Sequence, residues 1–314
     1  MIKQDKNISH GPLSWIILTA LVLTWGSSFI LMKKGLLYFS GEEVGLIRIS
    51  IAFLVLFPFG IRRLKSIDRK YFPLLTLSGT IGSLIPALLF AISETGIDSA
   101  LAGTLNSLTP LFALLIGLAF FKRKTKWFNV VGVFIGLLGA IGLILANSEG
   151  KIQVDVFYAS LVVFATILYG INVNFVKHFF KRISSLDITV MSFFFIGIPT
   201  IIYTLLFTPV IHKLVTRPEA WHGIGYIAIL AIAGTGLALI AYNYLIKLTT
   251  PVFASSVTYL IPAVAILWGV LDGEQLSPNF FMWFLVILTG VFLVNAKSVT
   301  NINLASKVIF RKNK

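Results

Sequence analysis

Cysteine is missing from the 314-residue sequence, and only 12% of the residues are charged. The lack of cysteine excludes disulfides, thiolate metal sites and cysteine nucleophiles. A soluble domain would carry about 25% charged residues to cover its surface. Because this chain has half that share and 57% hydrophobic residues, much of its surface must face something other than water. The composition predicts a protein embedded in lipid.

Long apolar runs fill most of the chain. A bilayer core of about 30 Å needs about 20 apolar helical residues. The runs lack the period-two alternation of a spanning strand. We therefore predict an all-α membrane protein with ten transmembrane helices, the first being a retained span rather than a cleaved signal peptide. The predicted spans are 14–32, 44–60, 72–92, 99–121, 127–146, 156–176, 188–208, 224–246, 252–271 and 279–296.

Basic residues are distributed unevenly between the loops. With the N-terminus placed inside, 20 of the 26 Lys and Arg fall in segments then predicted to be cytoplasmic. This bias predicts a multi-pass protein of the cell (plasma or inner) membrane with both termini cytoplasmic, including residues 1–13 and a basic tail, 298–314. The net charge of +14 is spread over short loops next to the bilayer. We therefore expect membrane lipids, and no nucleic acid, as partners of this charge.

Three short motifs recur in the same order in the two halves of the chain. They predict a first five-helix repeat, 14–147, and a second, 148–297. Because five is odd, the second copy enters the membrane inverted, which is typical of secondary transporters with a site near the midplane. The matching pairs are Trp25-Gly26-Ser27-Ser28 with Tyr169-Gly170-Ile171-Asn172, Ser78-Gly79-Thr80 with Ala233-Gly234-Thr235, and Leu108-Thr109-Pro110 with Leu260-Ile261-Pro262.

Several motifs resemble the EamA family of the drug/metabolite transporter superfamily, over roughly residues 14–297. The resemblance implies a ten-helix, two-repeat fold whose central cavity is lined mainly by helices 1, 3, 4, 6, 8 and 9. It also implies export or exchange of small, often amino-acid-like metabolites. One departure is the basic run Lys122-Arg123-Lys124, which replaces the acidic residue expected before span 5. The motifs are Leu23-Thr24-Trp25-Gly26-Ser27-Ser28-Phe29, Arg48 four residues before Ala52, Ala102, Leu108-Thr109-Pro110-Leu111-Phe112, and Gly273-Glu274.

Arg48 is the only charged residue inside a predicted span. A charge at the bilayer centre costs about 2.5–3.5 kcal/mol on insertion scales, so such residues usually face the bundle interior. Arg48 either contacts a substrate carboxylate or is structural, bonding helix-end carbonyls or one of Glu42, Glu43 and Glu94. We assign it a structural role, because the resemblance places helix 2 outside the main cavity lining.

Asn106 lies in the middle of a predicted span, one turn before Pro110. The proline ring removes the hydrogen bond that would reach the carbonyl of Asn106. A free carbonyl and an amide side chain then face one side of the helix, which is typical of a polar cavity. The alternative is an interhelical hydrogen bond that only holds the bundle together. Pro110 and Pro262 are assigned structural roles, as are Gly26 and Gly170.

Aromatic and polar residues pair on one helix face in each half. Trp25 and Ser28 are three residues apart, as are Tyr169 and Asn172, so each pair shares a face. These rings lie deeper than interfacial anchors usually do. Spans 8 and 9 add polar candidates, of which we select Asn243 and Tyr259. The predicted substrate-binding residues are therefore Trp25, Ser28, Asn106, Tyr169, Asn172, Asn243 and Tyr259.

Gly132, Gly136 and Gly139 form a close-packing face in span 5. This face either packs within the chain, which we favour, or contacts a second copy in a homodimer.

The spans offer no acidic residue, histidine cluster or metal-ligand set, and we expect no cofactor, no metal and no enzymatic activity. An intramembrane transferase is thereby disfavoured. We predict a secondary transporter, an exporter or exchanger of small metabolites working by alternating access. A flippase of a lipid-linked intermediate is the alternative. Glu94, just beyond span 3, is the nearest candidate for proton coupling, and we expect transport driven by the solute gradient.

Overall fold

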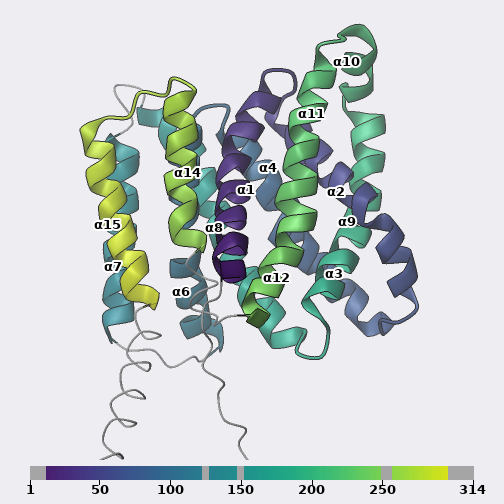
Figure 1. Cartoon of the computed structure of the whole chain (residues 1–314), viewed down its shortest axis with the longest axis horizontal. Coiled ribbons are helices and arrows are strands. Elements are labelled where there is room, and N and C mark those ends of the chain that lie inside the picture. Colours follow the sequence, from purple (N-terminus) through teal and green to yellow (C-terminus); the bar gives the residue numbers. More distant parts are fainter. Residues whose placement is uncertain (1–11, 122–126, 147–151, 249–256, 296–314) are drawn as a thin grey trace, which may run out of the picture.

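The computed structural model describes residues 12–121, 127–146, 152–248 and 257–295, and helix is the regular structure throughout these ranges (Figure 1). Eight of the described helices are long and apolar enough to cross a membrane, and two shorter apolar helices, 260–271 and 278–294, follow them. The prediction of an all-α membrane protein is confirmed, while the count of ten spans stays a prediction. Residues 252–256 of the predicted ninth span lie outside the described residues, as do 1–11 and the tail 298–314.

The helices of the first half fall within the residues of predicted spans 1 to 5 and the segments beside them. They are α1 (Pro12–Leu36), α2 (Gly41–Leu64), η1 (Arg69–Tyr71), α3 (Phe72–Gly79), η2 (Thr80–Leu84), α4 (Ile85–Ser93), α5 (Ser99–Leu105), η3 (Asn106–Leu108), α6 (Thr109–Phe121) and α7 (Trp127–Ala146).

The helices of the second half follow. They are α8 (Ile152–Phe179), α9 (Ser185–Phe207), α10 (Val210–Thr216), α11 (Ala220–Ala231), η4 (Ile232–Leu237), α12 (Ala238–Leu248), α14 (Val257–Leu271) and α15 (Pro278–Asn295).

Three of the long helical rods change their pitch near the middle. A π-helical turn, η2, joins α3 to α4, and a second, η4, joins α11 to α12. A 3-10 turn, η3, joins α5 to α6 directly before Pro110, where an α-helical hydrogen bond is impossible. Such turns are frequent at functional sites because they redirect backbone groups. All three lie beside the cavity described below.

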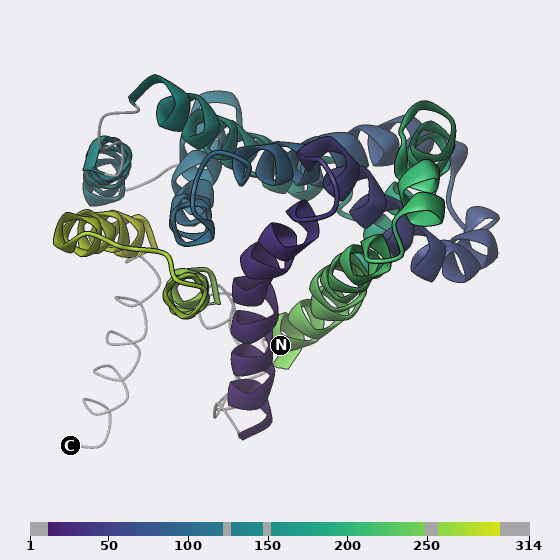
Figure 2. The same ribbon diagram turned by 90° about the horizontal axis from the view of Figure 1, so that it is seen from above.

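Helices α7 and α15 pack side by side at one edge of the bundle, as both views show (Figures 1 and 2). Their contact uses the predicted glycine face. A Cβ at Gly132 would lie 2.7 Å from the carbonyl oxygen of Gly290, and one at Gly139 would lie 2.8 Å from the backbone nitrogen of Ile287. Asn129 Nδ2 donates to the carbonyls of Leu293 and Val294. The glycine face therefore packs within the chain.

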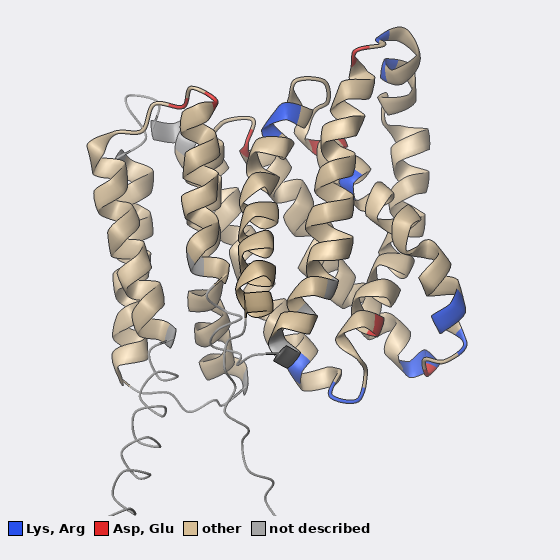
Figure 3. Ribbon diagram, viewed as in Figure 1, with Lys and Arg blue, Asp and Glu red and all other residues tan. Residues whose placement is uncertain are grey.

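The remaining helices surround the middle of the molecule. Helix α1 packs on α14 and α11, α8 packs on α6 and α4, and α2 packs on α9 and α4. Many large apolar side chains remain exposed on the outside, including Leu206 and Phe207 at the end of α9. Charged residues lie near the two ends of the described bundle, with few between them (Figure 3). This surface suits a bilayer.

Candidate functional site: a central cavity

A cavity of about 410 Å³ lies in the centre of the bundle, lined by helices from both halves. Most of its wall is apolar or aromatic, with a few polar groups among the rings. Its lining includes Arg48 and Ile49 from α2 and Phe193 from α9. More helices therefore line the cavity than the six that the resemblance implied, since α2 and α9 also contribute residues.

Five of the predicted substrate-binding residues line this cavity. They are Trp25, Ser28, Asn106, Tyr169 and Asn172. For Asn243 and Tyr259, the structure gives the helix position, in α12 and α14, but the side chains lie outside the described residues. The cavity also contains Tyr242, Thr235 and Thr258, which the sequence reasoning did not select.

One wall of the cavity is built by α1 and the π turn η4. The indole Nε1 of Trp25 donates a hydrogen bond of 2.8 Å to the carbonyl oxygen of Gly234. The Trp25 ring lies 5.3 Å from the ring of Tyr242, at an angle of 56°. The π turn thus presents a backbone carbonyl to a side chain from another helix. This contact was not visible in the sequence because it spans 209 residues.

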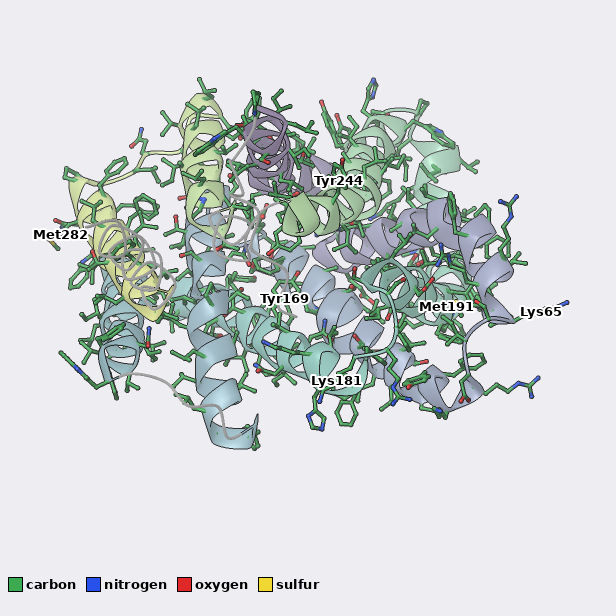
Figure 4. All side chains as sticks on the ribbon, turned by 60° about the horizontal axis from the view of Figure 1, so that its bottom comes forward. Lys65, Tyr169, Lys181, Met191, Tyr244 and Met282 are labelled. Carbon is green, nitrogen blue, oxygen red and sulfur yellow. The ribbon has the colours of Figure 1, made fainter. Side chains whose placement is uncertain are left out.

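The opposite wall is built by α8 and the π turn η2. Ser78 donates a hydrogen bond of 2.7 Å from its hydroxyl to Oδ1 of Asn172. A Cβ at Gly82 would lie 2.0 Å from Nδ2 of Asn172, so only glycine leaves room for this amide. The ring of Tyr169 stacks on Phe90 at 6.1 Å. Figure 4 shows Tyr169 near the middle of the molecule, with Met282 and Lys65 toward its two edges.

Arg48 is half-buried and lines the cavity without a hydrogen bond or ion pair to any described residue. Two of the three acidic partners suggested by the sequence interact with other residues. Glu43 pairs with Lys213, and Glu42 accepts a hydrogen bond from Tyr203. Both carboxyl oxygens of Glu94 are buried without a hydrogen-bond partner. The proposed structural bonds of Arg48 are therefore absent among the described residues.

The backbone carbonyl of Asn106 was expected to lack a hydrogen-bond donor, and in the structure it has two. It accepts the backbone N–H of Thr109 and, at 2.9 Å, the hydroxyl of Thr109. The 3-10 turn brings the donor three residues on into range, so this carbonyl is satisfied locally instead of facing the cavity unpaired. Only the Asn106 side chain remains a candidate ligand group.

The two predicted structural glycines lie at close helix crossings. A Cβ at Gly26 would lie 2.4 Å from Cβ of Val264 in α14. A Cβ at Gly170 would lie 2.9 Å from the backbone nitrogen of Ala113 in α6. Both crossings hold a cavity wall in place. Pro262 is buried inside α14.

A network of ion pairs lies at the end of the bundle where α1 ends. Lys33 contacts Asp272 at 2.9 Å and Glu274 at 2.8 Å, and Lys34 also pairs with Asp272. Glu274 accepts three further hydrogen bonds, from the backbone and hydroxyl of Ser99 and from the backbone of Ala100. These contacts explain the Gly273-Glu274 motif, in which Gly273 has φ 89°.

Hydrogen bonds from Lys34 and Lys33 hold the pKa of Asp272 below its ordinary value of 3.8.

The fold and the central cavity define a polytopic helical membrane protein with room for a small molecule between its helices. The model of the EamA-like transporter family matches residues 13–145 and again 156–296. Since these matches cover most of the chain, the protein belongs to the EamA-like transporter family. The resemblance stated from the motifs is confirmed.

Relatives span nearly the whole chain. The "probable terminal-alkyne amino-acid exporter" of Streptantibioticus cattleyicolor is 22% identical, over 88% of this chain and 92% of its own length. The uncharacterized inner membrane transporter YedA of Escherichia coli K12 is 28% identical, over 88% and 89%. A crystal structure covering 89% of this chain and 95% of its own superposes with a TM-score of 0.60 at 17% identity, which shows a shared fold.

Proposed function

We propose that this chain is a secondary transporter, an exporter or exchanger, that carries small amino-acid-like metabolites by alternating access around the central cavity. The observation that carries the proposal is Arg48. It lines the cavity and is bonded to no described protein group. Guanidinium groups bind carboxylates with two parallel hydrogen bonds. A substrate carboxylate is the partner that this position suits.

The rest of the cavity suits the remainder of an amino acid. A volume of about 410 Å³ lies in the range of small-molecule sites. Trp25 and Tyr242 present rings on one side, and Phe90 and Tyr169 present rings on the other. Such rings bury an apolar side chain, and their faces attract an ammonium group. The amino-acid exporter named among the relatives supports the same substrate class.

Related contacts in the two halves support an inverted repeat. Gly26 of span 1 meets Val264 of span 9, and Gly170 of span 6 meets Phe112 of span 4. The matching sequence motifs relate Gly26 to Gly170 and Phe112 to Val264. The same contact between helices therefore occurs twice, with the roles of the two halves exchanged. The paired π turns and the two family matches point the same way. Two similar halves around one site are the usual basis of alternating access.

The ion pairs of Lys33 and Lys34 supply an element that opens and closes. They tie the end of α1, directly after the lining residue Met32, to the turn between α14 and α15. Opening the cavity toward this end requires the pairs to separate. The pair of Lys34 and Asp272 is partly exposed, so its separation costs little, whereas Glu274 stays buried on its donors from α5 when Lys33 leaves it.

The test is a thermal-shift panel on the purified full-length protein. The compounds are L-leucine, 4-methylpentanoate, which lacks the ammonium group, 3-methylbutylamine, which lacks the carboxylate, and a polyprenyl phosphate. A ligand that binds only the folded state stabilises it by about 2.7 kcal/mol at a hundredfold excess over Kd. We expect shifts with leucine and 4-methylpentanoate, smaller or absent shifts with the amine, and loss of the shifts in Arg48→Gln.

Arg62→Gln is the matched control, because Arg62 is exposed at the far end of the same helix. Equal shifts in Arg48→Gln and the unchanged protein would remove the carboxylate from the proposal. If polyprenyl phosphate alone shifts the protein, the flippase function replaces amino-acid transport.

A further inference from the structure

The carboxyl group of Glu94 is buried and unpartnered. The residue is 8% exposed, and neither of its carboxyl oxygens has a hydrogen-bond partner among the described residues. An ionised carboxylate at such a position carries a large desolvation cost, whereas the neutral acid carries much less. Native proteins rarely leave such groups unsatisfied without a reason.

Glu94 directly follows α4, four residues after Phe90, and Phe90 lines the cavity and stacks on Tyr169. The carboxyl group therefore lies beyond the cavity wall, toward the end of the bundle that carries the ion pairs. It is not itself among the lining residues, so a substrate need not touch it to be influenced by its charge.

Charged groups from three other parts of the chain face Glu94. Arg48 of α2 and Lys33 of α1 attract its carboxylate, and Glu274 of the turn after α14 repels it. Lys33 already pairs with Glu274 and Asp272, whereas Arg48 pairs with no described residue. Arg48 is thus the cation still available to Glu94.

The other ionisable groups nearby have separate surroundings. Tyr169 of α8 interacts with Arg48, and the ring of Tyr158 lies against Gly96 in the turn after Glu94. Asp98 is the N-cap residue of α5 and makes its own interactions. Burial, and next the charge of Glu274, raise the pKa of Glu94 well above its ordinary value of 4.5.

We propose that Glu94 is the proton-binding site of this transporter. Arg48 stabilises the carboxylate of Glu94 when the cavity is empty and binds the substrate carboxylate when the cavity is occupied. This inference rests on the proposed function. In the empty state, ionised Glu94 is stabilised by the charge of Arg48. When a substrate carboxylate binds Arg48, that stabilisation is lost, and Glu94 takes up one proton from solvent. Release of the substrate reverses both steps, and the proton leaves from Glu94.

One proton and one carboxylate therefore move in the same direction. An outward solute gradient would export a zwitterionic amino acid together with a proton. This differs from the sequence-based expectation of transport driven by the solute gradient without a proton partner.

The first experiment needs no substrate. Infrared difference spectra of the full-length protein in micelles, recorded between acidic and neutral pH, report the carbonyl stretch of a protonated carboxylic acid. We expect a band that titrates well above the range of exposed glutamates, is absent in Glu94→Gln, and is retained in the exposed control Glu42→Gln. In Arg48→Gln its midpoint should move to higher pH, because a nearby positive charge is gone. A band retained in Glu94→Gln, or a midpoint unmoved by Arg48→Gln, overturns the proposal.

The second experiment uses proteoliposomes with an internal pH dye and labelled L-leucine. The number of protons moved per leucine should fall from one to zero in Glu94→Gln and stay at one in Glu42→Gln. An unchanged ratio in Glu94→Gln overturns proton binding at this residue. If leucine neither binds nor moves in the unchanged protein, the proposed substrate class fails, and the infrared result still decides whether Glu94 binds the proton.

Discussion

Glu274 and Glu94 lie at the same end of the bundle and are equally buried, at 9% and 8% exposure, yet their surroundings are opposite. Glu274 accepts hydrogen bonds from Lys33, from the backbone and hydroxyl of Ser99, and from the backbone of Ala100. Glu94 has no hydrogen-bond partner within the described residues. One carboxyl group is surrounded by donors, and the other has none within the described residues.

Two equally buried glutamates can therefore have different roles in one helical bundle. A carboxylate that joins α1, α5 and the turn before α15 stabilises one arrangement of the helices. A carboxyl group without donors stabilises no arrangement, but its charge depends on the cations around it. Burial alone therefore does not reveal the role of an acidic residue, whereas the number of its donors does.

The largest effect is expected from Glu274→Ala. It leaves buried donors of Ser99 and Ala100 without an acceptor, and Lys33 keeps only Asp272. We expect the free energy of unfolding to fall by about 2–4 kcal/mol, measured by chemical denaturation in detergent. Glu219→Ala, at an exposed helix start without a side-chain cap, should change it by less than about 0.5 kcal/mol. Equal losses in the two variants would contradict the role given to Glu274.

Ser99→Ala removes a single donor from Glu274 and keeps the backbone contacts. A hydrogen bond to a charged group contributes about 1.5–3 kcal/mol, and the remaining donors recover part of it. We expect a loss of about 1–2 kcal/mol in the same unfolding measurement. Since Ser99 donates at 2.7 Å while buried, a neutral result would show that the backbone donors alone hold the carboxylate.

Asp272→Asn should have a smaller effect, under about 1 kcal/mol at neutral pH, because its ion pairs are partly exposed. The pKa of Asp272 is lowered below 3.8 by Lys34 and Lys33, so its contribution is full above this pH and is lost as the pH falls through the lowered value. The stability difference between the variant and the unchanged protein should vanish in acid. A difference independent of pH would contradict an ionic contribution.

Glu94→Gln should have the smallest effect at low pH and a growing one above it. Because the pKa of Glu94 is raised by folding, the unchanged protein loses stability as the pH rises from about 4.5 through the raised value. Glutamine cannot ionise, so the variant should equal the unchanged protein in acid and become the more stable one at neutral pH. Thermal midpoints across this pH range test the sign. A variant less stable at neutral pH would show a hidden partner of Glu94.

Much of the site followed from the residue pattern in the sequence. Trp25, Ser28, Tyr169 and Asn172 were selected as two aromatic and polar pairs on helix faces, and all four line the cavity. Their common place in the lining follows because local spacing determines a helix face, and the motif repeat links the two faces; their role in substrate binding stays a prediction. Tyr242, which also lines the cavity, was not selected, because the direction in which its side chain leaves α12 depends on the π turn before it.

The assignment of Arg48 stays a prediction, but the structure places its side chain in the cavity lining, which the sequence did not indicate. The structural role was assigned to bonds with helix-end carbonyls or with one of Glu42, Glu43 and Glu94. Folding places Lys213 of α10 on Glu43 and Tyr203 of α9 on Glu42. Such long-range pairing follows from how α9 and α10 pack against α2, which local spacing does not reveal.

The sequence by itself determined that this protein is helical and lies in a membrane, since apolar runs of bilayer length leave the backbone no other way to satisfy its hydrogen bonds in lipid. It also determined the family, through motifs that lie within single helices. Only the tertiary structure decided which acidic side chains accept hydrogen bonds and which have no donor among the described residues. Glu274 and Glu94 are alike as residues, and their difference arises from helices brought together over 175 and more residues of chain.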